Sequence, residues 1–156
     1  MNNPKISILM GIYNCADTLE EAVVCIREQS IKDWELILCD DGSTDNTYEI
    51  AEQLKREDDR IVLLRNCKNL GLNRTLNKCL NASNGKYIAR MDDDDESMLD
   101  RLQKQVYFLE NNPDYSVVSA NASIFDDNGI YKELKYNENG YIYGDHELVN
   151  DLKFVM

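Results

Sequence analysis

The chain has 156 residues, which is enough for one domain with a sizeable core but short for two. Its net charge is −12, and its 17 basic residues do not cluster, which argues against a nucleic acid partner or an anionic membrane surface. No apolar run approaches the roughly 20 residues that a transmembrane helix requires.

Apolar runs alternate with segments of helical periodicity from residue 6 to about residue 112. Near-continuous apolar runs predict strands over residues 6–12, 34–39, 61–64 and 87–91. Four helices are predicted between and after these strands. One covers residues 47–57, and the other three are indicated by apolar residues at helical spacing: Leu19, Val23 and Ile26 in the first, Leu72, Leu76 and Leu80 in the third, and Leu99, Leu102, Val106 and Leu109 in the fourth. This order predicts an α/β fold whose mostly parallel sheet has helices on both faces.

The pattern changes after residue 113. Residues 115–120 are typical of a strand, and Asp126-Asp127-Asn128-Gly129 is a strong hairpin signal before a strand over residues 130–134. Residues 136–150 are polar and are assigned to no element. The apolar segment 152–156 has no closing signal, so we expect a chain truncated inside a structural element at its C-terminus.

Cysteine usage indicates the compartment. The five cysteines include no Cys-x-x-Cys pair, and several lie in apolar segments, where Cys behaves as a small hydrophobic residue. Residues 1–10 lack the charged and apolar regions of a signal peptide. We therefore expect a cytoplasmic protein.

Polar residues follow three of the predicted strands. Tyr13 follows the first, Asp40 and Asp41 end the second, and residues 92–95, which are four consecutive aspartates, follow the fourth. Ligands of such sheets bind at the carboxyl ends of the strands, where strand order reverses, so these residues are candidates for one site. Each also has a structural explanation: an aromatic ring covering the sheet edge, an Asp-Gly turn and a solvated acidic loop.

Four like charges in sequence repel one another, which a bound cation relieves. Mg²⁺ and Mn²⁺ prefer carboxylate oxygens, and Mg²⁺ usually binds one or two carboxylates together with substrate phosphates. The chain has no Gly-x-Gly-x-x-Gly, no Gly-Lys-Ser/Thr phosphate loop and no Gly-x-Ser-x-Gly. Its single histidine, His146, excludes a metal site built on several imidazoles.

Four ordered segments, residues 6–14, 34–45, 69–72 and 85–95, resemble the successive motifs of family 2 glycosyltransferases. The resemblance implies a Rossmann-like GT-A fold and transfer of a sugar from a nucleotide-sugar donor, often a UDP-sugar, with inversion at the anomeric carbon. It implies one domain over residues 1–156, with a nucleotide-sugar-binding core at 5–112 and the start of an acceptor-side region at 113–156. The resemblance also implies a role in the synthesis of cell-surface or extracellular polysaccharide.

Carried over by position, the resemblance implies roles at the first two strand ends. Tyr13 would stack on the base, and Asp41 would hydrogen-bond it with support from Asp40. Arg74 lies where the family often places a cation near the nucleotide, although an exposed helix Arg is the commoner explanation. Gly11 stands where the family often has Pro or Thr, so no side-chain contact is offered there.

The acidic run would supply the metal site of the family, the Asp-x-Asp motif. Asp92 or Asp93 would meet the ribose or the metal, and Asp94 would ligate the metal, Mn²⁺ or Mg²⁺. The acceptor implied is a saccharide or a lipid-linked saccharide. The full-length protein would then lie in the cytoplasm or peripherally at the inner face of the membrane.

The general base of the family, an Asp or Glu, is expected beyond Met156. No match in position to the family supports Asp145 or Glu147 in that role. A nucleotide- and metal-binding module without turnover is therefore the alternative. A metal-dependent nucleotidyltransferase would need a Gly-rich loop and Lys after the first strand, and a receiver-like domain would need paired acids there. This chain has neither feature at that position.

Overall fold

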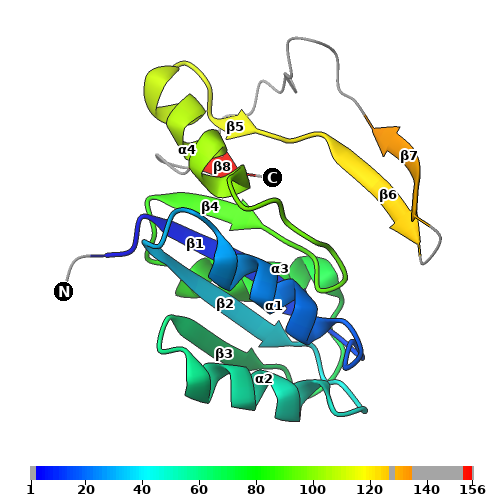
Figure 1. The fold of residues 1–156 in the computed structure, drawn as a ribbon. Coiled ribbons are helices and arrows are strands. Elements are labelled where there is room, and N and C mark those ends of the chain that lie inside the picture. The colour runs from blue at the N-terminus through cyan, green and yellow to red at the C-terminus, as the bar shows by residue number, and fades with distance from the viewer. Residues whose placement is uncertain (1–2, 127–128, 135–152, 156) are drawn as a thin grey trace.

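The computed structural model describes residues 3–126, 129–134 and 153–155. In this part of the chain, six strands form one sheet in the order β3-β2-β1-β4-β8-β5, and every pairing in it is parallel (Figure 1). The strands are β1 (Ile6–Ile12), β2 (Trp34–Asp40), β3 (Ile61–Arg65), β4 (Tyr87–Arg90), β5 (Val117–Val118) and β8 (Lys153–Val155). The predicted parallel α/β sheet is confirmed.

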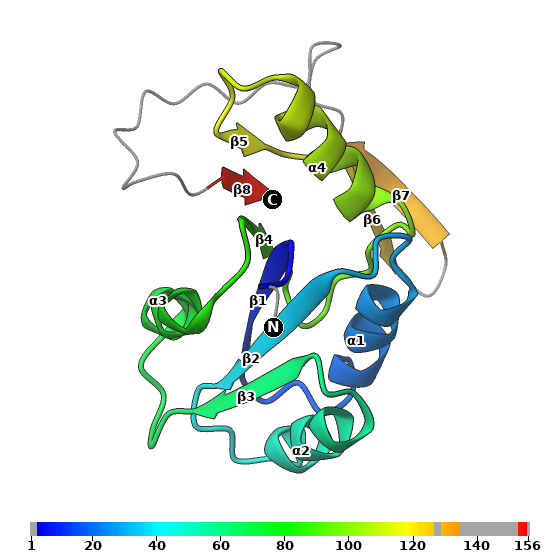
Figure 2. The same ribbon diagram turned by 90° about the vertical axis from the view of Figure 1, so that its left-hand side faces the viewer.

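Four helices connect and cover these strands: α1 (Leu19–Glu28), α2 (Thr47–Glu57), α3 (Leu72–Ala82) and α4 (Arg101–Asn111). Helix α3 lies on one face of the sheet, and α1, α2 and α4 lie on the other (Figure 2). Alternate residues of the central strand serve the two faces, as a strand buried on both sides requires. Ile8 and Met10 pack into the core under α1, whereas Leu9 packs toward α3.

Two helical patterns differ from the prediction. Leu99 is 59% exposed and precedes α4, whose buried face consists of Leu102, Gln105, Val106 and Leu109. In α3 the fully buried positions are Thr75 and Cys79, while Leu72 is 46% exposed. The apolar period predicted the helices correctly, but it assigned Leu99 to a helical face that the helix does not include.

The C-terminal part is confirmed only in part. The predicted strand over residues 115–120 is reduced to β5, and the predicted hairpin is present as β6 (Ala122–Asp126) paired antiparallel with β7 (Gly129–Leu134). The apolar end of the chain contains β8, which pairs with β4 and β5. Residues 136–150, including His146, Asp145 and Glu147, lie outside the described residues.

The order of the strands defines where a ligand can bind. From β1 the chain adds β2 and β3 on one side, and α3 then carries it back to place β4 on the other side of β1. Strand order therefore reverses between β1 and β4. In open parallel sheets the crevice outside the carboxyl ends at this point is the usual ligand site.

Candidate functional site

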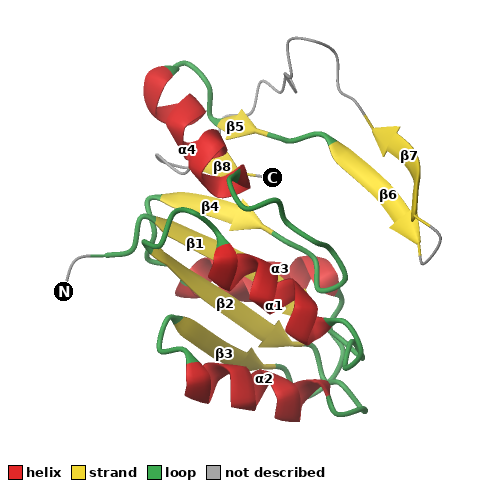
Figure 3. Cartoon of the chain, viewed as in Figure 1, coloured by secondary structure: helices red, strands yellow, loops and turns green. Residues whose placement is uncertain are grey.

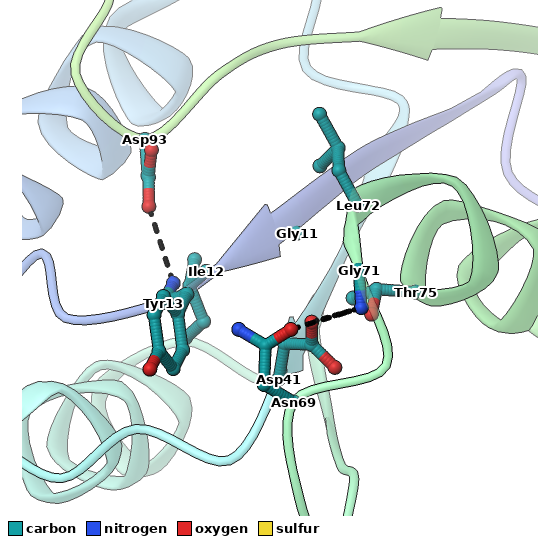
Figure 4. Close-up of a pocket in the computed structure, with 9 residues that line it drawn as sticks. All are labelled: Gly11, Ile12, Tyr13, Asp41, Asn69, Gly71, Leu72, Thr75 and Asp93. Atoms are coloured by element: carbon teal, nitrogen blue, oxygen red, sulfur yellow. Dashed lines mark hydrogen bonds between the residues drawn. The ribbon is translucent and has the colours of Figure 1, made fainter.

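A pocket of about 220 Å³ opens at the reversal point between β1 and β4 (Figure 4). Tyr13 and Asp93 lie on one side of it, Leu72 and Thr75 on the other, and Gly11 lies between them. The full lining is Gly11, Ile12, Tyr13, Asp41, Asn69, Gly71, Leu72, Thr75 and Asp93. Segments distant in sequence therefore meet at one sheet edge, which is where the strand-end residues were expected.

Tyr13 follows the last residue of β1 and stands at the pocket with 44% of its surface exposed. Its main-chain N–H donates to Oδ2 of Asp93 at 3.4 Å. The ring is thus held at the pocket by its backbone while nearly half of the residue stays open to solvent. An exposed ring beside a pocket is suited to stacking on a planar group.

Asn14 fixes the turn after β1. It has a φ of 51°, a left-handed conformation that Asn tolerates better than most residues. Its Oδ1 accepts a hydrogen bond from the Thr44 N–H at 2.9 Å, and its own N–H donates to Ser43 Oγ at 3.0 Å. The loops after β1 and β2 are therefore tied together beside the pocket.

Asp41 is only 4% exposed and lines the pocket. Its Oδ1 accepts hydrogen bonds from Asn66 Nδ2 and the Leu70 N–H, and its Oδ2 accepts one from the Gly71 N–H, at 2.8 to 2.9 Å. Burial raises the pKa of Asp41, but these hydrogen bonds outweigh it and hold the pKa below its usual value. The carboxylate thus fixes the segment before α3, a structural role that the sequence did not indicate.

Asp40 lies below the pocket rather than in its lining. It is fully buried, its Oδ1 accepts the Ser43 N–H at 3.1 Å, and its Oδ2 lies 3.1 Å from Nε of Arg65. The next residue, Gly42, has a φ of +76°, and a Cβ there would lie 2.7 Å from the backbone of Lys68. The Asp-Gly turn therefore borders the candidate site, to whose lining it contributes Asp41.

The acidic loop (residues 91–100) connects β4 to α4 (Figure 3). Asp92 forms a two-pronged ion pair with Arg90, at 2.8 and 2.9 Å from Nη2, and Asp93 reaches the pocket. Asp94 is exposed. Partial burial, together with the charges of Asp92 and Asp94, raises the pKa of Asp95. The structure thus brings one carboxylate of the run into the pocket and leaves its neighbours at the surface.

Two further residues are placed clearly. Arg74 is exposed in the first turn of α3 and does not line the pocket, although Leu72 and Thr75 beside it do. Burial and the neighbouring carboxylate of Asp93 raise the pKa of Cys15 to about 12. Cys15 is therefore a protonated thiol at neutral pH and not a nucleophile.

A divalent cation fits the chemistry of this loop. Among the described residues, no group of three or more His, Cys, Asp or Glu side chains is placed to hold a metal. Mg²⁺ commonly takes only one or two carboxylates and completes its shell with phosphates and water. Asp92, Asp93 and Asp94 carry oxygen donors of the kind that Mg²⁺ and Mn²⁺ prefer, and their role as metal ligands stays a prediction.

Residues of the α3 side were missed as site residues. Asn69, Gly71, Leu72 and Thr75 line the pocket, although none of them was given a role from the sequence. Two signals were available: residues 69–72 form one of the four family-like segments, and residues 66–71 follow β3 at the same sheet edge as Asp41. No helix in the described part of the chain is long and apolar enough to span a membrane.

Fold and site together define an α/β domain with an open parallel sheet, a pocket at the reversal point of the strand order and an acidic loop beside it. The sequence profile of Glycosyl transferase family 2 matches residues 7–155, and the chain belongs to that family. The resemblance seen in the sequence is confirmed.

Two curated relatives are longer than the segment that matches this chain. It is 50% identical over 130 residues to the putative glycosyltransferase EpsE of Bacillus subtilis, a match that covers 83% of this chain and 47% of EpsE. It is 36% identical over 105 residues to the Escherichia coli protein WfaP, a UDP-Glc:alpha-D-GlcNAc-diphosphoundecaprenol beta-1,3-glucosyltransferase, covering 67% of this chain and 41% of WfaP. The chain thus spans about half the length of the curated relatives that it matches.

Solved structures confirm the GT-A fold. The mannosyltransferase PcManGT of Pyrobaculum calidifontis, in complex with GDP-Man and Mn²⁺, superposes with a TM-score of 0.69 at 23% identity, covering 76% of this chain and 36% of that protein. S. aureus TarS 1–349 in complex with UDP-GlcNAc gives a TM-score of 0.68 at 21% identity, with 74% and 34% covered. At these identities the likeness shows the fold alone.

Proposed function

We propose that this chain binds a nucleotide-diphosphate sugar, with a UDP-sugar as the donor, in the pocket between β1 and β4. One observation carries the proposal: the pocket collects Tyr13, Asp41 and Asp93 from three separate strand ends at the reversal point of the sheet. WfaP, which is named for the donor UDP-Glc, is 36% identical to this chain, and this supports uracil as the nucleotide base. The whole protein then transfers the sugar to a hydroxyl acceptor with inversion.

In this proposal the base lies against the exposed ring of Tyr13, and Asp41 accepts a hydrogen bond from a base N–H. Because Asp41 already accepts several N–H groups of residues 66–71, it also holds the α3 side of the pocket against the nucleotide. Asp40 supports the turn through Ser43 and Arg65. Arg74 would approach the phosphates only as a solvent-exposed cation at the rim.

Asp92, Asp93 and Asp94 would hold Mn²⁺ or Mg²⁺ together with the diphosphate. The bound ion supplies electrostatic stabilisation of the negative charge that develops on the departing nucleoside diphosphate. The cation reduces the repulsion among these carboxylates and between them and the diphosphate, which makes nucleotide binding dependent on metal. Asp93, with its link to the Tyr13 backbone, couples this loop to the base side of the pocket.

The acceptor belongs to the whole protein. The name of WfaP includes an undecaprenol-linked saccharide, which supports a lipid-linked saccharide acceptor and a role in cell-surface polysaccharide synthesis. With such an acceptor, the full-length protein would lie in the cytoplasm or peripherally at the inner face of the membrane. Because this chain spans about half of its relatives, we also propose a second reading, in which it binds donor and metal without transferring the sugar.

Calorimetric titration of UDP into this chain, with Mn²⁺ and then with EDTA, tests the donor site. We expect binding with Mn²⁺, none with EDTA and a large loss in Asp94→Ala. Asp59→Ala is the matched control, because Asp59 is exposed just before β3, at the opposite edge of the sheet. Failure of UDP, GDP, CDP and dTDP to bind the folded chain would contradict the proposal.

A further inference from the structure

Gln29 is a buried polar side chain outside the pocket that makes several hydrogen bonds. It is fully buried at the C-terminal end of α1, where its main-chain N–H donates to the Ile26 carbonyl. Its Nε2 lies 2.8 Å from the Met98 carbonyl oxygen, 3.4 Å from the Ser97 carbonyl oxygen and 3.3 Å from Ser97 Oγ. Its Oε1 accepts the Leu102 N–H at 3.2 Å. One side chain thus joins α1, the end of the acidic loop and the start of α4.

Arg101 reaches the same point from α4. Its Nε donates to Ser97 Oγ at 2.7 Å, and its Nη2 lies 4.0 Å from Sδ of Met91. Met91 begins the acidic loop and Ser97 directly follows the five consecutive acids at residues 92–96, so this guanidinium contacts both ends of that acidic run. A positive charge held beneath the loop also offsets part of the repulsion among its acids.

After Asp92, which Arg90 holds at 2.8 and 2.9 Å, the middle of the loop is held more loosely. Asp94 and Glu96 are exposed, and the loop hydrogen bonds from Tyr13 to Asp93 and from Asp95 to Asp92 measure 3.4 and 3.5 Å. By contrast, the side chain of Gln29 is fully buried, lies 2.8 Å from the Met98 carbonyl oxygen and accepts the Leu102 N–H in a buried hydrogen bond. The position of the carboxylates after Asp92 therefore depends on the fixed end of the loop at Ser97 and Met98.

We propose that Gln29 and Arg101 form a buried clamp on Ser97 and Met98 that positions the acidic loop for the donor and its metal. The inference rests on the proposed function, and it makes both side chains positioning residues, because neither lines the pocket. Gln29 orients the loop by donating to two carbonyl oxygens, and Arg101 orients it through the hydroxyl of Ser97. Side chains that hold metal-binding groups in place typically contribute about 10- to 100-fold in affinity.

Two variants test the clamp. In Gln29→Glu a carboxylate replaces the amide donor and faces the oxygens of Ser97 and Met98, which repels the loop. Ser97→Ala removes the shared acceptor with a smaller change in the core, so it keeps the test open should Gln29→Glu fail to fold. The matched controls are Gln103→Glu, which keeps the acceptor for the Ser30 hydroxyl, and Ser30→Ala.

The first measurement is hydrogen exchange of the chain without ligand. Amides of residues 92–99 should exchange about fivefold faster or more in Gln29→Glu and Ser97→Ala, while those of β1 and β2 stay protected and show that the fold is intact. Gln103→Glu and Ser30→Ala should match the unmodified chain. Unchanged exchange at residues 92–99 in both test variants would overturn the clamp.

The second measurement is calorimetric binding of UDP with Mn²⁺ to the same proteins. The affinity should fall about 10-fold or more in the two test variants and stay within about twofold in the controls. Faster exchange with unchanged affinity would overturn the positioning role. If the unmodified chain binds no nucleotide, the proposed function fails, and the exchange experiment, which uses no ligand, still decides whether the clamp holds the loop.

Discussion

The main-chain N–H of Tyr13 donates to Oδ2 of Asp93, a carboxylate that lies 80 positions further along the chain. The contact joins the carboxyl ends of β1 and β4, the two strands between which the sheet order reverses. The residue expected to stack on the base and one expected to meet the ribose or metal are therefore neighbours through the backbone. A substitution of the Tyr13 side chain leaves this link in place, so the contribution of the ring can be measured separately.

Replacing Tyr13 by Ala should weaken UDP binding by about 1–3 kcal/mol, because the stacking surface is lost. Tyr13→Phe should keep most of the affinity, since the ring remains. Calorimetry with Mn²⁺ measures both. Equal affinity in Tyr13→Ala and the unmodified chain would show that the ring does not contact the base.

Asp41→Asn should destabilise the fold, because an amide cannot accept all the N–H groups that converge on this carboxylate; the expected loss at pH 7 is about 1–3 kcal/mol. The folded-state pKa of Asp41 lies below the ordinary value of 3.8, so its stabilisation is complete above that value and is lost as pH falls through the lower, folded pKa. The difference in unfolding free energy between the two proteins should therefore shrink below about pH 4. Urea unfolding at several pH values checks this, and a difference that grows in acid would contradict it.

Two glycines separate backbone strain from close contact. Gly42 and Gly71 have φ values of +76° and +87°, but only at Gly42 would a Cβ meet other atoms, the backbone of Lys68 at 2.7 Å. Gly71→Ala should cost about 1–3 kcal/mol from a backbone conformation that glycine alone adopts readily, and Gly42→Ala should cost more, because the contact with Lys68 adds to the backbone strain. Thermal or urea unfolding compares them, and equal costs would show that the turn shifts away from Lys68 freely.

Cys15 reports on the charge of Asp93. Because burial and Asp93 raise the pKa of this thiol to about 12, iodoacetamide at pH 8 should alkylate the exposed Cys67 well before Cys15. Asp93→Asn removes the carboxylate charge, lowers the pKa of Cys15 and should accelerate its alkylation. Mass spectrometry of the digested protein follows each site, and an unchanged rate at Cys15 would contradict the proximity of the two groups.

Hydrophobic periodicity predicted the β1-to-α4 core because buried parallel strands and amphipathic helices leave strong local patterns. The same patterns placed Tyr13, Asp41 and Asp93 near one edge, since strand ends in this topology meet there. Assignment of Leu99 to the α4 face was wrong, because an apolar residue in a loop can extend a helical period without being helical.

The rest depends on contacts between residues far apart in sequence. The roles of Asn66, Leu70 and Gly71 at Asp41 are set by hydrogen bonds across 25 to 30 positions, which no local pattern encodes. Three residues were too few to mark β8 as a strand, since its neighbours β4 and β5 come from elsewhere in the chain. The binding roles predicted for the site residues all stay predictions: Tyr13, Asp40, Asp41, Arg74, Asp92, Asp93 and Asp94.

The position of β8 has a consequence for contacts between molecules. Within the described sheet, β5 pairs with β8 alone, and β8 separates it from β4. Without β8, β5 would have no partner in the described sheet, and the backbone edge of β4 would be unpaired. Unpaired edges of apolar strands such as Tyr87–Arg90 invite pairing between molecules. The pairing of β8 with β4 therefore protects this strand from pairing with another molecule.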